Sequence, residues 1–209
     1  MGRPRQHDET TARALLDASE SRLKDGGLDG VSLRAIADDA GVSVRAVYSL
    51  FGDKDGLVAA LAARALGRLA DRIAGLPAAD DPVADPVADL VNAGCVGFRE
   101  VALEHPETYR LTWERIYATA PGSASRDTWA PEGRRALQAL LAWVRRAFPD
   151  EPAASVRHHD IAAGFHAVCQ GLASCEINGV FTAMRVRDPA RLWRDTLAAY
   201  VAGLSRTTT

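Results

Sequence analysis

Residues 31–57 contain two short helix patterns separated by a glycine turn. The first helix is expected at about 33–39 and the second at about 44–50, each directly after a serine suited to cap it. Gly41 lies in the tight turn between them, and Gly52 ends the second helix. Two short helices joined by such a turn are typical of helix-turn-helix geometry. We expect their small core to contain Leu33, Ile36, Ala37, Ala40, Val42 and Val47.

Helical periodicity continues along the rest of the chain. Apolar residues recur at three- and four-residue intervals from Ala12 to Leu23, and every fourth residue from Leu57 to Ile73. The 39 alanines favour helix, because alanine loses no side-chain entropy there. Segments that alternate β-branched and polar residues are absent, so the sequence predicts an all-α fold. Further helices are expected at about 86–104, 106–119, 131–148, 153–179 and 189–205.

Several classes of protein are excluded by the distribution of charge and cysteine. The longest stretch without Asp, Glu, Lys or Arg is the 15 residues 161–175, whereas a membrane-spanning helix needs roughly 20 apolar residues. The N-terminus has no apolar core behind its charges, so it does not read as a signal peptide. The three cysteines form no C-x-x-C pair and fit a reduced setting. We therefore expect a cytoplasmic protein without a membrane partner.

The outward side of the second short helix is suited to a DNA major groove. One arginine and several small side chains can enter a groove about 12 Å wide. Residues 1–55 hold eight basic and ten acidic residues, so a binding face must be segregated from an acidic one. The residues expected on the outward side are Val44, Arg45, Ala46, Ser49 and Leu50.

Phosphate contacts are expected from groups around this helix. Tyr48 offers a hydroxyl, and Lys54 enters the first turn of the next helix. Ser32 and Ser43 stand at helix N-termini, where free N–H groups point at anions. A short basic arm at the N-terminus, suited to a minor groove, contributes Arg3 and Arg5.

Four short motifs keep a fixed joint spacing in this part of the chain. They are Gly-Leu-Asp-Gly-Val-Ser-Leu-Arg-Ala-Ile-Ala at 27–37, Ala-Gly-Val-Ser at 40–43, Val-Tyr-x-x-Phe at 47–51 and Asp-Lys-x-x-Leu at 53–57. With the amphipathic helix before them, these motifs resemble the N-terminal domain of TetR-family transcriptional regulators, over residues 10–57. The resemblance implies that Tyr48 and Lys54 touch phosphates. It also implies contacts to base edges or adjoining backbone from Arg34, Val44, Arg45 and Ser49.

The chain departs from the family pattern at one DNA-facing position. Many members carry His before the Phe of the recognition helix, and Leu50 stands there in this chain. One phosphate or base contact of the family is therefore not expected here.

The resemblance also implies an all-helical regulatory domain after residue 58, dimerised through its last two helices. Apolar stripes on both expected helices support a two-fold four-helix interface. The other interpretation is that the stripes face the core of their own chain. We divide the chain into a helix-turn-helix DNA-binding domain, 1–57, and a helical ligand-binding and dimerisation domain, 58–209. The expected interface residues are Ile161, Leu172, Trp193, Leu197, Tyr200 and Leu204.

A small-molecule pocket is expected in the C-terminal domain. Residues 105–113 look like the start of a domain type found in part of the family, whose later helix carries Trp and then His-Gly. His166 and Gln170 replace that Trp and His here, which makes the helix more polar. Aromatic walls with a few polar groups are typical of ligand pockets, although an aromatic on a helical face belongs to the core more often. The candidate pocket residues are Phe98, Trp113, Tyr117, Trp143, Phe165, His166, Cys169 and Gln170.

The sequence contains no arrangement that predicts catalysis. His158 and His159 are adjacent and point about 100° apart on a helix, so they are poorly placed to share a metal. We interpret them, with Asp160, as a solvated helix start. No Gly-rich phosphate loop, G-x-S-x-G or purposeful carboxylate pair occurs. We therefore expect no catalytic residue, no metal and no cofactor.

The combined expectation is a ligand-responsive repressor. It would bind a palindromic, double-stranded operator as a homodimer and be released by a small-molecule inducer that the sequence does not identify. The alternative is a helical small-molecule-binding protein or enzyme with a degenerate helix-turn-helix. Arg45, Tyr48 and Lys54 together argue against that alternative.

Overall fold

The computed structural model of the 209-residue chain describes residues 4–77, 85–120, 122–149 and 156–206. Regular structure in these ranges is helical, and they contain no strand, which confirms the all-α class. The chain divides into two compact units, each made from two separate segments. Unit 1 is Met1–Leu66 with Glu107–Glu132, and unit 2 is Gly67–Pro106 with Gly133–Thr209.

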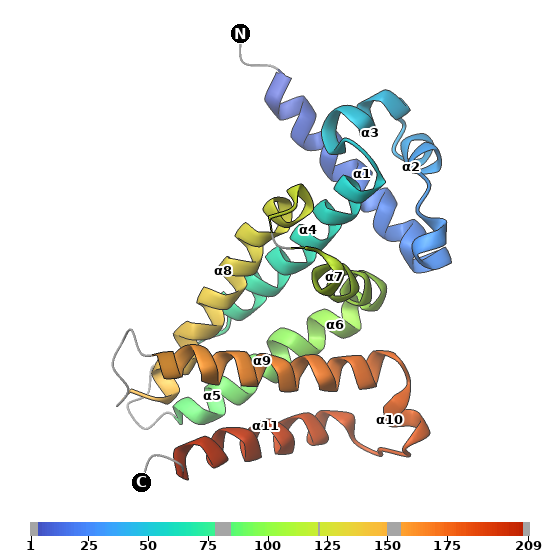
Figure 1. The fold of residues 1–209 in the computed structure, drawn as a ribbon. Coiled ribbons are helices and arrows are strands. Elements are labelled where there is room, and N and C mark those ends of the chain that lie inside the picture. Colours follow the sequence, from blue (N-terminus) through green and yellow to red (C-terminus); the bar gives the residue numbers. More distant parts are fainter. Residues whose placement is uncertain (1–3, 78–84, 121, 150–155, 207–209) are drawn as a thin grey trace. The chain divides into compact units, whose positions relative to one another are not determined.

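Unit 1 combines the N-terminal helices with a segment from further along the chain (Figure 1). Its elements are α1 (Pro4–Gly26), η1 (Gly27–Gly30), α2 (Leu33–Asp39), α3 (Val44–Phe51), the first part of α4 (Lys54–Ala74), most of α7 (Pro106–Ala118) and the start of α8 (Ala124–Ala147).

One apolar core joins the elements of unit 1. Leu111 of α7 is buried in it together with residues of α1, α2, α3 and α4. Beside it, Trp129 at the start of α8 packs against Ala59, Ala62 and Leu66 of α4. The segment 107–132 is therefore part of the packing that holds the N-terminal helices. The buried members of the first core are Leu15, Leu23, Val31, Ile36, Ala37, Val47, Leu57, Val58, Leu61 and Leu111.

Unit 2 is built around the last two long helices. α11 packs against α9, α5 and η2. The single-turn α10, which the sequence pattern did not predict, lies between α9 and α11 (Figure 1). The expected helix at 86–104 is one helical run with a π-helical middle, η2. The elements are the end of α4, α5 (Pro86–Asn92), η2 (Ala93–Arg99), α6 (Glu100–Glu104), the rest of α8, α9 (Val156–Ile177), α10 (Val180–Ala183) and α11 (Pro189–Arg206).

Two glycines allow η2 to pack closely against its neighbours. A Cβ atom added at Gly94 would lie 2.5 Å from Leu197 Cδ1 and 3.0 Å from Phe165 Cζ. A Cβ atom added at Gly97 would lie 2.8 Å from Ile73 Cγ1. These distances are well below the separation of about 3.5–4.0 Å at which carbon atoms attract. Only glycine therefore permits this approach of η2 to α11, α9 and the end of α4.

Two helices begin earlier than the sequence pattern indicated. α1 begins at Pro4, because proline suits the first helical position. Arg5, predicted to belong to a basic arm, therefore lies in the first turn of a helix, and Arg3 lies outside the described residues. α8 begins at Ala124, so Pro131 stands inside the helix and not at its start.

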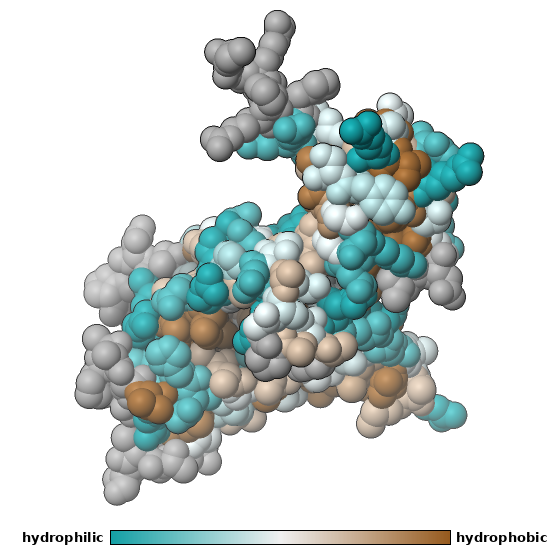
Figure 2. All heavy atoms as spheres, turned by 45° about the horizontal axis from the view of Figure 1, so that its top comes forward, coloured by the Kyte–Doolittle hydropathy of each residue, from teal (hydrophilic) through white to brown (hydrophobic). Residues whose placement is uncertain are grey.

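The described surface is largely polar. Hydrophilic residues cover much of the face shown in Figure 2, with smaller apolar areas between them. Within the described ranges, every helix is too short or too polar to cross a lipid bilayer.

Candidate nucleic-acid interface

The turn between α2 and α3 depends on Gly41. This residue adopts a left-handed φ of 67°, which glycine enters without strain. The N–H of Val42 then donates to the carbonyl of Ala37 at 2.9 Å. At the end of α3, Gly52 has a φ of 78°, and its N–H donates to the carbonyl of Tyr48 at 2.9 Å. Both glycines end helices where the sequence predicted.

Ser32 and Ser43 occupy matching positions before α2 and α3, but only one of them caps its helix. The Ser43 hydroxyl accepts a hydrogen bond from the N–H of Ala46 at 3.3 Å, as predicted. The Ser32 side chain makes no capping bond, so that part of the prediction is wrong. Ser32 is exposed, and solvent can satisfy the free N–H groups of α2.

The outward face of α3 contains fewer exposed residues than predicted. Tyr48 is 54% exposed. Ala46, which we expected to face outward, is half-buried. Val44 and Leu50, expected on the same side, are half-buried against the core of unit 1. They lie three residues on either side of the fully buried Val47, so the helical period turns them inward. The exposed side chains of this face are Arg45, Tyr48 and Ser49.

Further polar side chains stand at the neighbouring helix starts. Arg34 in the first turn of α2 and Lys54 in the first turn of α4 are exposed. Asp53 precedes α4, and its carboxylate accepts a hydrogen bond from the N–H of Gly56 at 2.8 Å. The candidate interface therefore joins the outward face of α3 to the first turns of α2 and α4.

Acidic side chains near these helices are held by arginines that the sequence analysis did not single out. Asp39, at the end of α2, is bound by Arg22 of α1 through two hydrogen bonds of 2.5 and 2.9 Å. The Arg22 guanidinium lowers the pKa of the Asp39 carboxyl. Asp55, beside Lys54, is bound by Arg115 of α7 at 3.0 Å. No local pattern could predict these pairs, because their partners lie 17 and 60 residues apart.

Most aromatic residues predicted to line a pocket in unit 2 are packed core instead. The Trp143 indole donates its N–H to the carbonyl of Ile73 at 3.0 Å. His166 and Gln170 are half-buried on α9, and the His166 ring lies 5.4 Å from the Phe98 ring, edge to face. Burial lowers the pKa of His166, so its imidazole is neutral at pH 7. The fully packed residues are Phe98, Trp143, Phe165 and Cys169.

The other two predicted pocket residues belong to α7 in unit 1. Trp113 lies 6.0 Å from the Tyr109 ring and packs against the apolar cluster that contains Trp129. Tyr117 lies on the same helix, and its side chain is outside the described part of the chain. These two residues are thus assigned to a different compact unit from Phe98 and His166.

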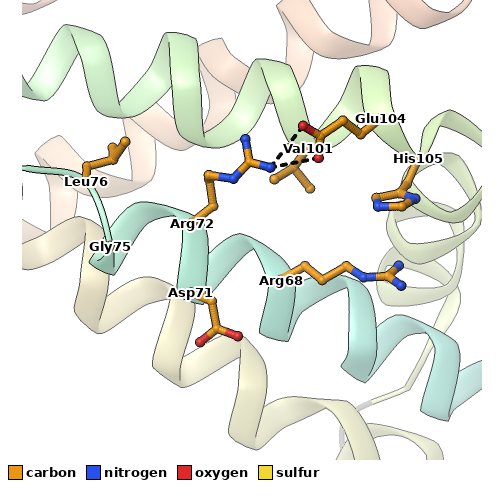
Figure 3. Close-up of a pocket in the computed structure, with 8 residues that line it drawn as sticks. All are labelled: Arg68, Asp71, Arg72, Gly75, Leu76, Val101, Glu104 and His105. Carbon is orange, nitrogen blue, oxygen red and sulfur yellow. Dashed lines mark hydrogen bonds and ion pairs between the residues drawn. The ribbon is translucent and has the colours of Figure 1, made fainter. Parts of the chain in front are cut away.

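A groove of about 490 Å³ lies between α4 and α6 in unit 2 (Figure 3). Arg72 holds its two sides together, because its guanidinium donates to Glu100 and to Glu104 at 2.8 Å each. Asp71 pairs with Arg135 of α8. None of the predicted pocket residues lines this groove. Its lining residues are Arg68, Asp71, Arg72, Gly75, Leu76, Val101, Glu104 and His105.

Half of the predicted dimer residues are buried inside the chain. Ile161 is 2% exposed, and Trp193 and Leu197 are 0% exposed. The Trp193 indole donates to Glu176 at 2.8 Å, and Glu176 also accepts two hydrogen bonds from Arg99. The centre of each apolar stripe therefore faces its own core, and these three residues cannot form an interface. Partly exposed members of the prediction are Leu172, Tyr200 and Leu204.

His158 is also placed differently from the prediction of a solvated helix start. It is 1% exposed, and its Nε2 lies 3.1 Å from the carbonyl oxygen of Phe148, which follows α8. His159 and Asp160 are exposed as expected. In the described part of the chain, no three His, Cys, Asp or Glu side chains gather as metal ligands. The three cysteines are free thiols.

A helix-turn-helix pair of this kind is a DNA-binding motif. The family model described as "Bacterial regulatory proteins, tetR family" matches residues 15–61. The model described as "Tetracyclin repressor-like, C-terminal domain" matches residues 91–200, more than half of the chain. The chain belongs to the TetR family, whose members are regulators of transcription and not enzymes.

Individual relatives agree with this assignment. The HTH-type transcriptional regulator Rv1816 of Mycobacterium tuberculosis is 33% identical over 161 residues, which are 77% of this chain and 64% of that protein. Mb1846 of Mycobacterium bovis matches to the same extent. The match thus spans less than two thirds of these relatives.

Two solved structures share the fold. A TetR-family regulator from Streptomyces coelicolor has a TM-score of 0.70 at 22% identity, covering 96% of this chain and 84% of that one. PfmR, a TetR-family regulator from Thermus thermophilus, has a TM-score of 0.59 at 16% identity, covering 90% and 97%.

The contribution of the Ser43 cap can be measured as a change in the free energy of unfolding. Ser43→Ala should lower the free energy of unfolding by about 1 kcal/mol, because it removes the hydrogen bond to Ala46. Ser32→Ala is the matched control and should cost clearly less, since its hydroxyl caps nothing. Urea unfolding of both variants without DNA tests this. Equal losses would contradict the assignment of a single side-chain cap.

Proposed function

We propose that this protein is a repressor that binds a palindromic operator as a homodimer and releases it when a small molecule binds. The observation that carries the DNA-binding part is α3. This helix is capped at Ser43, anchored by the buried Val47 and exposed at Arg45 and Tyr48. An anchored helix with an exposed polar face can enter a major groove about 12 Å wide. We propose residues 1–57 as the DNA-binding domain and 58–209 as the ligand-binding and dimerisation domain.

The proposed contacts divide into base readers and phosphate binders. Arg45 lies in the first turn of α3, where its guanidinium can bind a guanine edge bidentately. The Tyr48 hydroxyl and the Lys54 ammonium fix the position on the duplex through phosphates. Secondary contacts are proposed for Ser32, Arg34, Ser43 and Ser49, with Arg3 and Arg5 of the N-terminal segment reaching further along the DNA.

We propose that the dimer forms through the exposed faces of α9 and α11, and not through their buried stripes. Ala163, Ala167 and Gly171 are exposed on α9 at intervals of four residues. Ala198 and Ala202 are exposed on α11 with the same spacing. Small side chains in such rows let helices approach closely, and a two-fold axis would pair each row with a second copy. A dimer that binds an operator must hold two α3 helices about 34–36 Å apart, the spacing of successive major grooves.

We place the ligand in the groove between α4 and α6. Its walls carry Arg68, Arg72 and His105 beside the carboxylates of Asp71 and Glu104. A small anionic molecule could bind the guanidinium groups there by competing with these carboxylates. A carboxylate bound to Arg72 would replace Glu104 and loosen the link between the helices. α4 continues from unit 1 into unit 2. We therefore propose that a displacement of α4 transmits ligand binding to the DNA-binding helices. Release of DNA requires that the ligand prefer the displaced state of α4.

The DNA-binding assignment can be tested with two variants and a charge-matched control. Arg45→Ala should weaken binding by about 1–3 kcal/mol at a duplex selected by the wild-type protein from random-sequence DNA. Lys54→Ala should weaken binding to all DNA sequences alike. It should also reduce the salt dependence of the binding constant by about one released ion per subunit. Arg134→Ala, at an exposed site on α8, should leave binding unchanged. Unaltered affinity in both test variants, measured by fluorescence anisotropy, would overturn the assignment.

The dimer surface can be tested by introducing one charge. Ala167→Glu should yield monomers in sedimentation velocity experiments, because the carboxylate would be buried without a partner in the interface. Gln138→Glu introduces a carboxylate on the exposed side of α8 and should leave the dimer intact. A dimeric Ala167→Glu protein would show that the copies associate elsewhere.

The ligand site can be located by thermal shift. A library of small carboxylic acids is screened, and a compound at 100 times its Kd should add about 2.7 kcal/mol of stability. Arg72→Ala should abolish this gain, whereas His166→Leu and Gln170→Leu should retain it. The opposite pattern would place the ligand beside α9, as the sequence pattern predicted.

A further inference from the structure

An ion pair connects α7 to the first turn of α4. Arg115 donates from Nη2 to Asp55 Oδ1 at 3.0 Å. The two residues lie 60 positions apart and belong to the same compact unit. The Asp55 side chain is 67% exposed and the Arg115 side chain 27% exposed. The acid therefore faces solvent, while the arginine lies against the protein.

The position of Asp55 creates an electrostatic problem for DNA binding. Asp53 and Asp55 flank Lys54, the residue proposed to hold a phosphate. A carboxylate within a few ångströms of a phosphate group repels it and offsets the attraction of Lys54. Asp53 already accepts the N–H of Gly56 as the cap of α4. Asp55 has no such role in the backbone, and its charge is met by Arg115.

The packing of α7 within unit 1 determines where Arg115 lies. Leu111 lies one turn earlier on α7 and is buried in the core of unit 1. Residues four apart on a helix share a face, so the anchor at Leu111 presents Arg115 towards α4. An exposed ion pair of this kind adds little to folding stability. Stability alone therefore does not account for the pair.

We infer that Arg115 is a positioning residue for DNA binding. It holds Asp55 and cancels its charge, so that Lys54 and the N-terminus of α4 can accept a phosphate. By this means α7, which lies outside the helix-turn-helix, contributes to operator affinity without touching DNA. The inference rests on the proposed function, because it requires Lys54 to lie at the DNA backbone.

The experiment measures affinity for a duplex that the wild-type protein selects from random-sequence DNA. Arg115→Gln should weaken binding by about threefold to tenfold at low salt, the scale of one uncompensated surface charge. The loss should shrink as salt is raised, because screening weakens the repulsion. Arg115→Lys keeps the charge and should bind like the wild type. Arg110→Gln removes the same charge from α7, where Arg110 pairs with Glu107, and should have no effect.

A double-variant cycle separates this role from a direct contact. In an Asp55→Asn background, Arg115→Gln should change affinity by no more than about twofold, because no charge is left to cancel. Equal binding by Arg115→Gln and Arg110→Gln would overturn the inference. An undiminished loss in the Asp55→Asn background would also overturn it, since Arg115 would then act on DNA itself. If the wild-type protein selects no duplex, the proposed function fails and this inference with it.

Discussion

The close approach of η2 to its neighbours is the constraint on which unit 2 depends. Gly94 and Gly97 leave no room for a Cβ atom against α11, α9 and α4. The approach brings Arg99 within reach of Glu176, which in turn receives the indole N–H of Trp193. A larger residue at either glycine would push η2 away from a neighbouring helix, and at Gly94 it would strain this partly buried network. The close packing of α11 against η2 therefore depends on the absence of a side chain at Gly94.

In unit 1, three arginines bind acidic side chains that lie on other helices. Arg22 binds Asp39, Arg64 binds Asp17, and Arg115 binds Asp55. Acidic residues outnumber basic ones in the first 55 positions. Pairing lets the fold keep this acidic content while Arg34, Arg45 and Lys54 remain exposed. The sum of charges therefore says little about the face that would meet DNA.

Local patterns predicted the elements of the fold and the helix-turn-helix well. The burial of Val47 and of the row from Leu57 to Ile73 follows from the helical period alone. Gly41 and Gly52 end helices because few other residues adopt their backbone angles. The boundaries were less certain where a proline could stand either at a helix start or inside a helix, as at Pro131.

Questions about partners could not be settled from the sequence. An apolar stripe shows that a helix buries one face, but it does not show whether the cover is its own chain or a second copy. This ambiguity explains the error at Trp193 and Leu197. The same holds for His158, whose polar neighbours suggested solvent although it is buried and lies within hydrogen-bond distance of the Phe148 carbonyl oxygen. Pairs such as Arg115 and Asp55 depend on packing between distant segments, which leaves no trace in local spacing.

The discontinuous make-up of unit 1 has a consequence for how the protein is synthesised. The chain leaves and re-enters this unit, and Leu111 and Trp129 close apolar surfaces formed by residues before position 67. On the ribosome, Leu111 and Trp129 are synthesised dozens of residues after the N-terminal helices with which they pack. Contacts between such distant segments slow folding. Unit 1, which contains the helix-turn-helix, is thus completed only after residues 107–132 have been synthesised.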